Sequence, residues 1–478
     1  MPIRVEAMLA PGHVSASHST AVDALRESYA AIPPGRTVRL AKRTSNLFRP
    51  RSSQPVAGLD VSGLDGVIDV DIERRTADVQ GMCTYERLVD ATLPYGLMPL
   101  VVPQLKTITL GGAVSGLGIE SSSFRNGLPH ESVVEMDVLT GDGRVVTCAP
   151  GGPAEDLFAA FPNSYGTLGY AVRLRIELEP VSAYVALQHV RFTDLDELTG
   201  AIDSICRDRR WHGKAVDFLD GVVFEPSEAY LTLGQWSSTV HEAGLLTPSD
   251  YTGRQIYYKS IRERSHDVLT THDYLWRWDT DWFWCSGAFG AQHPLVRRLW
   301  PSRYRRSDVF HHIVGLESRY QVAARIDRWR GKPARERVIQ DVEIPVERTA
   351  DFLRWFADRV PMSPIWLCPL QLRERASGGD GASRPWPLYP LAANRVYINV
   401  GFWGTVPVTP GSRDRDMNIM IEQAVAAHDG HKSLYSDAYY DQDTFEKLYG
   451  GSAYETVKDS YDPDHRLTGL YEKTVGRR

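Results

Sequence analysis

The sequence has few cysteines, and their spacing excludes the usual roles of clustered thiols. There are five, an odd number in 478 residues, and no two of them form a Cys-x-x-Cys pair. Disulfide frameworks and structural zinc sites are built from cysteines in paired, closely spaced positions. We therefore expect reduced thiols, as in a cytoplasmic protein, at Cys83, Cys148, Cys206, Cys285 and Cys368.

Excess positive charge and long apolar runs are also missing. Lys and Arg number 54 against 60 Asp and Glu, which gives a formal net charge of -6. This balance argues against a general nucleic-acid binder, because phosphate contacts need a basic surface. No apolar run approaches the roughly 20 residues that span a bilayer, and the first residues lack the regions of a signal peptide. We expect a soluble cytoplasmic protein with at most peripheral membrane contact.

Several functional fingerprints are absent as well. No Gly-x-Gly-x-x-Gly lies between a strand and a helix, as nicotinamide dinucleotide sites require. No Gly-Lys-Ser/Thr completes a P-loop, and no HExxH or clustered His/Asp spacing indicates a metal site. The sequence therefore predicts no metal centre and excludes the two most common nucleotide-binding loops.

The sequence does contain a glycine-rich stretch, Thr107–Ser123, with four glycines within eight residues. Without a Cβ, the backbone can approach a ligand closely, and successive N–H groups can form an anion-binding concavity. A glycine loop alone is equally typical of a structural turn. Two further polar or glycine-bearing turns at expected strand ends, Lys42–Arg49 and Ser164–Tyr170, favour the binding of a pyrophosphate.

The length predicts two or three compact units. The first, to Pro180, alternates short strands such as 66–71 and 76–80 with few helices, and Thr140–Gly143 indicates a hairpin. The second unit is crowded with aromatic residues between Tyr251 and Phe310. Its expected strands are 340–345, 364–370 and 395–402, and its expected helix is 347–360.

Taken in order, these motifs resemble the FAD-binding domain of the vanillyl-alcohol-oxidase/p-cresol-methylhydroxylase (PCMH) superfamily. The resemblance rests on Arg43–Asn46, Pro103–Ser123 and Tyr165–Gly169. Within that superfamily the sequence is most similar to the delta24-sterol reductases of the seladin or DIMINUTO type. The motifs that carry this closer similarity are Gly116–Ser123, Pro364–Pro369, Tyr435–Tyr439 and Phe445–Gly450.

The resemblance implies an α+β fold in which a two-subdomain PCMH-type FAD-binding domain is joined to an α+β substrate-binding cap domain with an antiparallel sheet. The expected boundaries are 1–180 for the FAD-binding domain and 181–430 for the cap. Residues 431–478 are expected to return to the FAD-binding domain. The N-terminal membrane anchor of the animal sterol reductases is not expected in this sequence.

The resemblance also implies which residues bind FAD. One turn would hold a phosphate, the glycine-rich stretch would wrap the pyrophosphate and ribityl chain, and a third turn would touch the adenine half. The implied residues are Lys42, Arg43, Thr44, Ser45, Asn46, Leu47, Thr109, Leu110, Gly111, Gly112, Ser115, Gly116, Gly118, Ile119, Glu120, Ser121, Gly166, Thr167, Gly169 and Tyr170. Neither His nor Cys occurs in Lys42–Arg51 or Thr107–Ser123, so we expect FAD to be bound noncovalently.

The implied reaction is the reduction of an isolated carbon–carbon double bond in a lipid, with NADPH or NADH as the reductant. An isolated alkene cannot delocalise charge into a carbonyl, so a positioned acid and electron-rich aromatic faces are needed in a dry pocket. The candidate acids are Glu120, Tyr397, Tyr439 and His312, with Tyr435 beside them. For each, a buried hydrogen-bonding role is the alternative, and Glu120 could instead hold backbone N–H groups or the ribityl hydroxyls.

The stretch Trp300–Arg306 mixes aromatic and basic residues, which indicates a surface able to enter anionic lipid headgroups; a solvated charged face is the alternative. Two other functions stay open at this point. A flavin-dependent alcohol oxidase or dehydrogenase would reduce its flavin without nicotinamide. A noncatalytic lipid-binding protein on a flavin fold would be colourless when purified.

Overall fold

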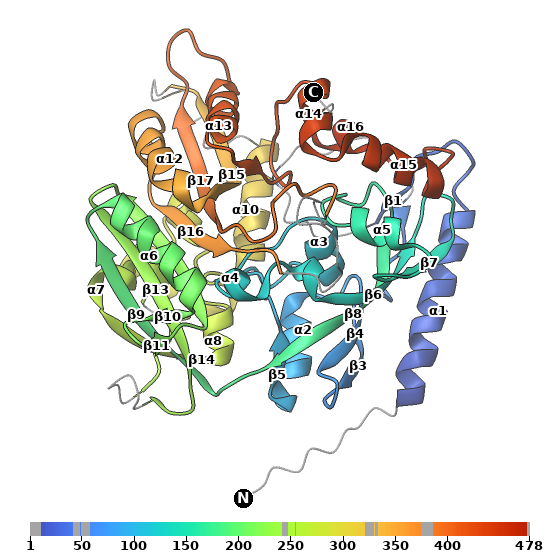
Figure 1. The fold of residues 1–478 in the computed structure, drawn as a ribbon, viewed down its shortest axis with the longest axis horizontal. Coiled ribbons are helices and arrows are strands. Elements are labelled where there is room, and N and C mark those ends of the chain that lie inside the picture. Colours follow the sequence, from blue (N-terminus) through green and yellow to red (C-terminus); the bar gives the residue numbers. More distant parts are fainter. Residues whose placement is uncertain are drawn as a thin grey trace, which may run out of the picture.

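The computed structural model describes residues 11–41, 48, 58–240, 247–253, 255–320, 329, 333–373 and 386–475. Two large antiparallel sheets organise these residues, and Figure 1 shows one at the lower right and the other at the left. A small parallel pair, β1 (Arg39–Leu40) with β2 (Gly58–Leu59), lies apart from both sheets. This arrangement confirms the predicted α+β class.

The first sheet is built around β8 (Tyr170–Pro180), which pairs with β4 on one side and β6 on the other. Apolar and polar residues alternate along β8, so the side chains of Leu174 and Ile176 are buried on one face of the sheet. Arg173 lies on the other face and forms ion pairs with Asp78 and Asp137 of the neighbouring strands. The remaining strands are β3 (Val67–Asp71), β4 (Thr76–Gln80), β5 (Leu97–Pro99), β6 (Val133–Leu139) and β7 (Val145–Cys148).

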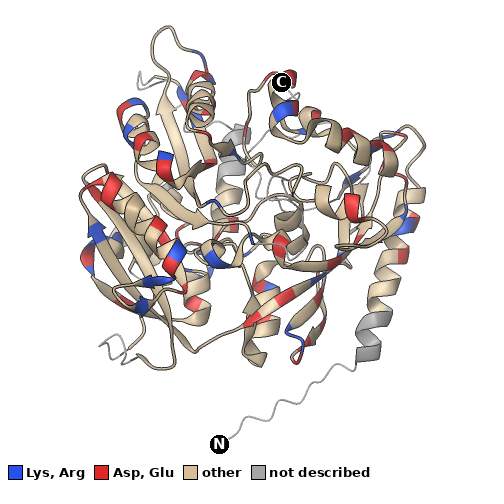
Figure 2. Cartoon of the chain, viewed as in Figure 1, with Lys and Arg blue, Asp and Glu red and all other residues tan. Residues whose placement is uncertain are grey.

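The second sheet has the order β14-β9-β13-β12-β16-β17-β15-β18 and belongs to the expected cap. Figure 2 shows that β16 and β17 carry no charged residues, as expected for strands inside a sheet that is covered. Its strands are β9 (Tyr184–Phe192), β12 (Phe218–Glu225), β13 (Glu228–Ser237), β14 (His266–Thr270), β15 (Arg335–Pro345), β16 (Ile365–Leu370), β17 (Tyr397–Pro407) and β18 (His431–Lys432). The short strands β10 (Arg210–Trp211) and β11 (Lys214–Ala215) form a separate hairpin.

Three helices cover one face of the second sheet, and their apolar side chains form a core with it. Ile202 of α6 and Phe352 of α12 belong to this core together with Leu231, Leu367 and Val400 of the strands. These helices are α6 (Leu195–Asp208), α12 (Val346–Arg359) and α13 (Asp416–Ala427). The opposite face of the sheet is turned toward the first sheet.

The other helices lie around the first sheet and along the connections between the two sheets (Figure 1). They are α1 (Pro11–Ala30), α2 (Tyr85–Thr92), α3 (Leu110–Ser115), α4 (Ser123–Asn126), α5 (Glu155–Ala160), α7 (Tyr257–Glu263), α8 (Thr271–Leu275), α9 (Pro294–Leu299), α10 (Ser307–Tyr320), α14 (Gln442–Leu448), α15 (Gly451–Tyr461) and α16 (Leu470–Thr474). Short 3-10 turns occupy Leu93–Tyr95, Pro129–Ser132, Cys285–Phe289 and Ser302–Tyr304. In the part of the chain that is described, no helix combines the length and apolarity needed to cross a membrane.

The C-terminal helices pack against the first sheet and its connections. The ammonium of Lys458 donates to the carbonyl of Thr167 at 2.8 Å and to Asp462 at 2.6 Å. The backbone N–H of Asp142, in the β6–β7 hairpin, donates to the carbonyl of Tyr461. These bonds tie the end of the chain to the first sheet and the turn before β8. The predicted boundaries at residues 180 and 430 stay a prediction.

Most expected elements are present, but the glycine-rich stretch differs from the expected loop. Residues 110–115 form the short helix α3, because Thr109 is extended and its side chain accepts from the N–H of Gly112, as an N-cap does. The strands β3, β4, β15, β16 and β17 and the helix α12 lie where the sequence pattern placed them.

Candidate functional site

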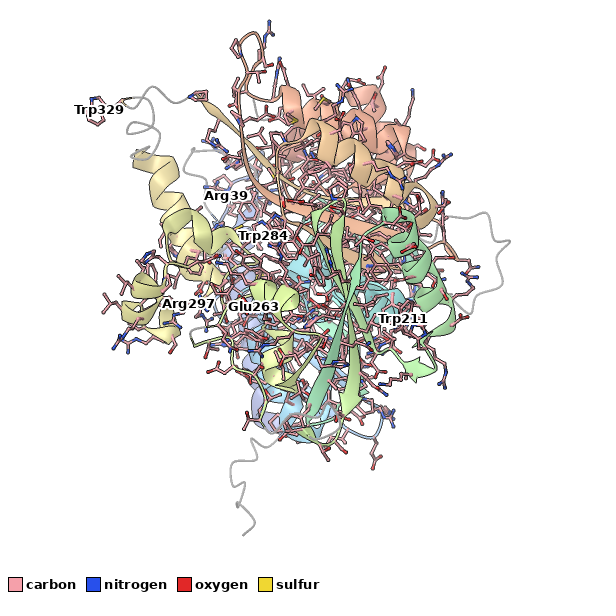
Figure 3. The ribbon with its side chains drawn as sticks, turned by 90° about the vertical axis from the view of Figure 1, so that its left-hand side faces the viewer. Arg39, Trp211, Glu263, Trp284, Arg297 and Trp329 are labelled. Atoms are coloured by element: carbon pink, nitrogen blue, oxygen red, sulfur yellow. The ribbon has the colours of Figure 1, made fainter. Side chains whose placement is uncertain are left out.

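A cavity of about 1410 Å³ lies between the two sheets. Pockets for small ligands usually have roughly 300–1,000 Å³, so this cavity can take a ligand of dinucleotide size with room beside it. One wall comes from α3, the chain after it and the start of β8; the other comes from β15, β16, β17 and the aromatic segment around Trp284. Figure 3 shows Trp284 near the middle of the molecule, with Arg39 above it.

The glycines of α3 serve close packing, and their N–H groups are occupied by protein acceptors. The N–H of Gly111 donates to the carbonyl of Gly81 at 2.9 Å, and the N–H of Gly116 donates to the carbonyl of Gly112 at 3.0 Å. A Cβ on Gly111 would lie 2.7 Å from the Gly81 oxygen. Glycine is therefore required here for backbone approach, and the expected N–H concavity does not form within α3.

Free N–H groups occur directly after α3. Within the described residues, the backbone N–H groups of Leu117, Gly118 and Ile119 have no protein acceptor, and all three residues line the cavity. A Cβ on Gly118 would lie 2.8 Å from Pro103. The chain at 117–119 thus presents unsatisfied donors toward the cavity, which is what an anionic pyrophosphate needs.

The Ser164–Tyr170 turn forms the adjoining wall. Gly166 has φ +75° and Gly169 has φ +145°, conformations that residues with a side chain rarely adopt. Gly166, Gly169 and Tyr170 line the cavity, whereas Thr167 is buried behind them. Arg39 of β1 and Lys473 of α16 also line the cavity, so two cations face the space where phosphates are expected.

Ten of the twenty predicted FAD-binding residues line the cavity: Thr109, Gly111, Gly112, Ser115, Gly116, Gly118, Ile119, Gly166, Gly169 and Tyr170. Four others, Leu110, Glu120, Ser121 and Thr167, are buried just outside the lining. The expected phosphate turn, Lys42–Leu47, lies outside the described residues. The cavity wall is therefore mainly the one that the sequence motifs indicated.

Aromatic side chains form the cap wall. The ring of Phe283 lies 4.3 Å from that of Trp403 and 5.4 Å from that of Trp366, measured between centroids. Trp284 lies 5.3 Å from Trp403. All four line the cavity, whereas Trp276 and Trp278 lie in the core behind it. Some of the aromatic residues between Tyr251 and Phe310 therefore line the cavity, and others belong to the hydrophobic core.

A polar cluster interrupts this aromatic wall. On β17, the Asn399 amide N–H donates to Oδ1 of Asp341 on β15 at 3.1 Å. The Trp403 indole N–H donates to the Tyr435 hydroxyl oxygen at 2.8 Å, and Tyr435 in turn hydrogen-bonds Asp341. Gly401 makes room for this contact, since a Cβ there would lie 2.5 Å from Asp341 and 2.7 Å from Trp403. All four hydrogen-bonded side chains line the cavity.

The cluster contains a carboxyl group suited to donating a proton near neutral pH. Burial raises the pKa of Asp341 to about 6, although the hydrogen bonds from Asn399 and Tyr435 oppose that shift. Burial also raises the pKa of Tyr435 well above its usual value, with the Asp341 charge as the next cause. Asp341 can therefore exist in both protonation states at working pH, while Tyr435 stays protonated.

Glu120 lies outside the cavity lining, in a buried ion cluster. Its Oε1 accepts from Arg277 Nη2 at 2.8 Å and from the Ser121 hydroxyl at 2.7 Å. The same Arg277 nitrogen donates to Asp220 of β12 at 2.8 Å. Burial raises the pKa of Glu120, and the Arg277 charge opposes the shift. The cluster joins the end of the glycine-rich stretch to the cap sheet.

The other three predicted acids do not line the cavity either. The Tyr397 hydroxyl is buried and accepts from the N–H of Ala392 at 3.1 Å. His312 is exposed on α10, and its Nδ1 lies 2.6 Å from the carbonyl of Asp308. The backbone N–H of Tyr439 donates to Glu422. Of the three tyrosines considered as acids from the sequence, Tyr435 is the one that lines the cavity.

Asp341, Asn399 and Trp403 were not selected from the sequence as functional residues. The available signal was a pair of acidic residues, Asp341 and Glu343, within the expected strand 340–345. Strand pairing, which brings Asp341 opposite Gly401, cannot be read from one sequence. Cys285 also lines the cavity, and burial raises the pKa of its thiol to about 12, which keeps the thiol protonated and unreactive.

The side chains fit a bound FAD and do not suggest a metal. A cavity of this size combines unsatisfied N–H groups, three cationic side chains (Arg39, Arg337 and Lys473) and a buried polar atom without a partner among the described residues, Asn399 Oδ1. Such an orphaned acceptor in a cavity wall suits the polar edge of a flavin ring. Within the described ranges, no three His, Cys, Asp or Glu side chains gather as metal ligands would.

Comparison with known proteins agrees with this geometry. Residues 17–149 match the family described as the FAD binding domain. The chain is 24% identical over 419 residues to the Delta(24)-sterol reductase of Macaca fascicularis. This alignment covers 85% of this chain and 75% of the relative. It is also 24% identical over 441 residues to the Delta(24)-sterol reductase of Arabidopsis thaliana, with 87% and 76% covered.

A shorter match is to a protein with a different name. Cytokinin dehydrogenase 10 of Oryza sativa subsp. japonica is 32% identical over 177 residues, 37% of this chain and 31% of that protein. The long matches are to sterol reductases and the short one is to a dehydrogenase. Together with the domain match, they confirm the predicted resemblance to the PCMH-type FAD-linked oxidoreductases and to their sterol-reductase-like branch.

Proposed function

We propose that this chain, an FAD-dependent oxidoreductase similar to the Delta(24)-sterol reductases, reduces an isolated carbon–carbon double bond in a lipid, with NADPH or NADH as the reductant. The observation that carries the proposal is a titratable carboxyl, Asp341, set in the aromatic wall of the cavity. An alcohol oxidase would need a base to accept a proton from a hydroxyl. The long similarity to sterol reductases favours the reductase.

The FAD would be held by residues already in position. Gly111 and Gly116 keep the backbone close, the N–H groups at 117–119 face the pyrophosphate region, and Arg39 and Lys473 supply positive charge. When bound, the reduced flavin supplies a hydride to one alkene carbon. We propose that the link is noncovalent; flavin that stays on the polypeptide after acid precipitation would refute this part.

Asp341 would supply the proton that the other alkene carbon needs. Its carboxyl gives up H⁺ as the hydride arrives, so the double bond gains two hydrogens and no charge remains. Asn399 and Tyr435 hold the carboxyl in the wall, and Trp403 holds Tyr435. The carboxylate that results is reprotonated from solvent before the next turnover.

The aromatic wall would serve two further purposes. Phe283, Trp284 and Trp403 exclude water from the lipid alkene and cover its apolar surface. Their ring faces also stabilise the positive character that develops on the neighbouring alkene carbon, the one that accepts the hydride, because aromatic faces attract cations. A sterol side chain and an unsaturated or methylene-bearing fatty acyl chain both carry an alkene of this kind.

The experiment uses the purified protein with its flavin. It is incubated with NADPH or NADH and either a side-chain-unsaturated sterol or an unsaturated phospholipid, and the products are identified by mass spectrometry. The proposal predicts a nicotinamide-dependent product that carries two more hydrogen atoms in one of these lipids. A different result would refute the proposal: neither lipid gains hydrogen, but the protein oxidises an alcohol when oxygen or another electron acceptor is supplied. The protein would then be an alcohol oxidase or dehydrogenase.

A further inference from the structure

The helix α9 and the turn after it form an exposed apolar ridge beside the cavity. Leu295 is 66% exposed, Leu299 is 82% exposed and Tyr304 is 45% exposed. Leu295 and Leu299 are four residues apart and so lie on the same face of the helix. Val296 is exposed as well, so the ridge has four exposed large hydrophobic residues. These are half of all the exposed large hydrophobic residues in the described part of the chain.

The ridge lies next to the cavity along the chain. Trp284, Cys285 and Gln292 line the cavity, and α9 begins two residues after Gln292. Figure 3 shows the segment around Arg297 projecting at the left-hand edge of the molecule, with Trp284 further in. A molecule bound on the ridge would therefore be close to the aromatic wall.

The inner side of α9 fixes the ridge to the protein. The guanidinium of Arg297 is buried and donates to Asp281 at 2.6 Å and to the carbonyls of Gly253 and Gln255. Trp300 packs against Phe310 with ring centroids 6.0 Å apart. The apolar residues on the outer side are thus presented by a firmly held helix, and their exposure does not come from fraying.

The charge of this segment is positive, unlike that of the whole chain. From Trp282 to Ser307 there are five arginines and no acidic residue, although the net charge of the protein is -6. Arg297 and Arg306 are neutralised by Asp281 and Glu86. Arg298 and Arg303 are exposed beside the ridge, and no carboxylate among the described residues pairs with either.

We propose that the ridge formed by Leu295, Val296, Leu299 and Tyr304, with Arg298 and Arg303, docks the protein on an anionic membrane surface. The apolar residues enter the boundary between headgroups and acyl chains, and the two arginines contact anionic headgroups. This docking places the cavity where a lipid substrate resides; that consequence rests on the proposed function. A second copy of the chain is a less suitable occupant, because two such positive ridges repel each other.

The test is sedimentation of the flavin-loaded protein with vesicles of phosphatidylcholine, with or without phosphatidylglycerol. The wild-type protein should bind the anionic vesicles more strongly than the neutral ones. The double variant Leu295→Asp/Leu299→Asp should bind at least about tenfold more weakly, because the burial of two leucines is lost. The double variant Arg298→Glu/Arg303→Glu should lose about tenfold or more on anionic vesicles and little on neutral ones.

The matched control is Ile72→Asp, which alters an exposed hydrophobic residue in the β3–β4 turn, 51% exposed and away from the ridge. It should bind like the wild-type protein. The proposal would be overturned if the wild-type protein bound neither kind of vesicle, or if the leucine variant bound the anionic vesicles as strongly as the wild type. A leucine variant that changes from dimer to monomer in gel filtration, without any vesicle binding by the wild type, would instead assign the ridge to a second copy.

A second readout separates this proposal from the proposed function. The leucine variant should reduce a detergent-dispersed lipid alkene at the wild-type rate and lose activity only on vesicles. Vesicle binding without reduction of any lipid would leave the docking surface intact and refute the reductase. Reduction of dispersed lipid without vesicle binding would refute the docking surface and leave the proposed reductase function intact.

Discussion

The Asn399 amide donates to the carboxyl of Asp341 across the β15–β17 pair, with 3.1 Å between Nδ2 and Oδ1. The two residues come from neighbouring strands near one end of the second sheet, and both line the cavity. This hydrogen bond fixes the orientation of the carboxyl, and burial raises its pKa to about 6. It is the feature from which the proposed chemistry follows, and most of the predictions below address it.

The variant Asp341→Asn should lose alkene reduction while keeping its flavin. Asparagine has nearly the same shape and cannot donate the proton, so the step that reoxidises the flavin with lipid should slow by about 100-fold or more. Reduction of the flavin by nicotinamide should be unchanged. Stopped-flow absorbance measures both half-reactions separately. The exposed Asp414→Asn is the matched control; a normal lipid step in Asp341→Asn would exclude Asp341 as the acid.

The rate of the lipid half-reaction should decrease as the pH rises. The active form of Asp341 is protonated, and its pKa is about 6. The rate should therefore be constant below about pH 6 and fall about tenfold per pH unit above it. Burial also raises the pKa of Glu343, two residues along β15, well above its usual value. A rate that rises with pH would indicate a base at this position.

The variant Tyr435→Phe should move that pH profile upward. The Tyr435 hydroxyl donates to Asp341 and lowers its pKa, against the larger effect of burial. Removing this donor destabilises the carboxylate, so the midpoint of the profile should shift to higher pH by up to roughly one unit. A merely structural tyrosine would change stability and leave the midpoint in place. Rate profiles of the wild type and the variant between pH 5 and about 9 decide this.

The variant Gly111→Ala should reduce both stability and flavin content. Its Cβ would lie 2.7 Å from the Gly81 carbonyl oxygen, so the backbone must move, at a cost of about 1–3 kcal/mol. Urea unfolding and the ratio of flavin to protein absorbance measure the two effects. Gly200→Ala is the control, because nothing lies within 4 Å of that position on α6; it should raise stability by about 1 kcal/mol. Normal flavin content in Gly111→Ala would contradict the close-packing account.

The variant Glu120→Gln should destabilise the protein and leave the chemistry intact. It removes one of the two carboxylates that neutralise the buried Arg277, a loss of about 3 kcal/mol in the free energy of unfolding. The lipid half-reaction, measured per bound flavin, should keep its wild-type rate. If that rate falls about 100-fold in a stable protein, Glu120 is the acid after all, as one interpretation of the sequence allowed.

The sequence predicted the glycine-bearing wall of the cavity better than its aromatic wall. Glycine spacing and strand patterns are local, so Thr109–Gly118 and Gly166–Tyr170 could be found from residue type alone, although Thr109 caps a helix that was expected to be a loop. Asp341 and Asn399 are 58 residues apart in sequence and meet only through the register of two strands. Glu120 was noticed for its motif, but its partner Arg277 lies 157 residues away.

The most direct test of the central claim is an anaerobic titration of the oxidised protein, followed by flavin absorbance. NADPH or NADH should bleach the flavin, and a lipid alkene added afterwards should restore its absorbance in proportion to the double bonds consumed. Absorbance that no nicotinamide bleaches, or that returns only when oxygen is admitted, would contradict the account.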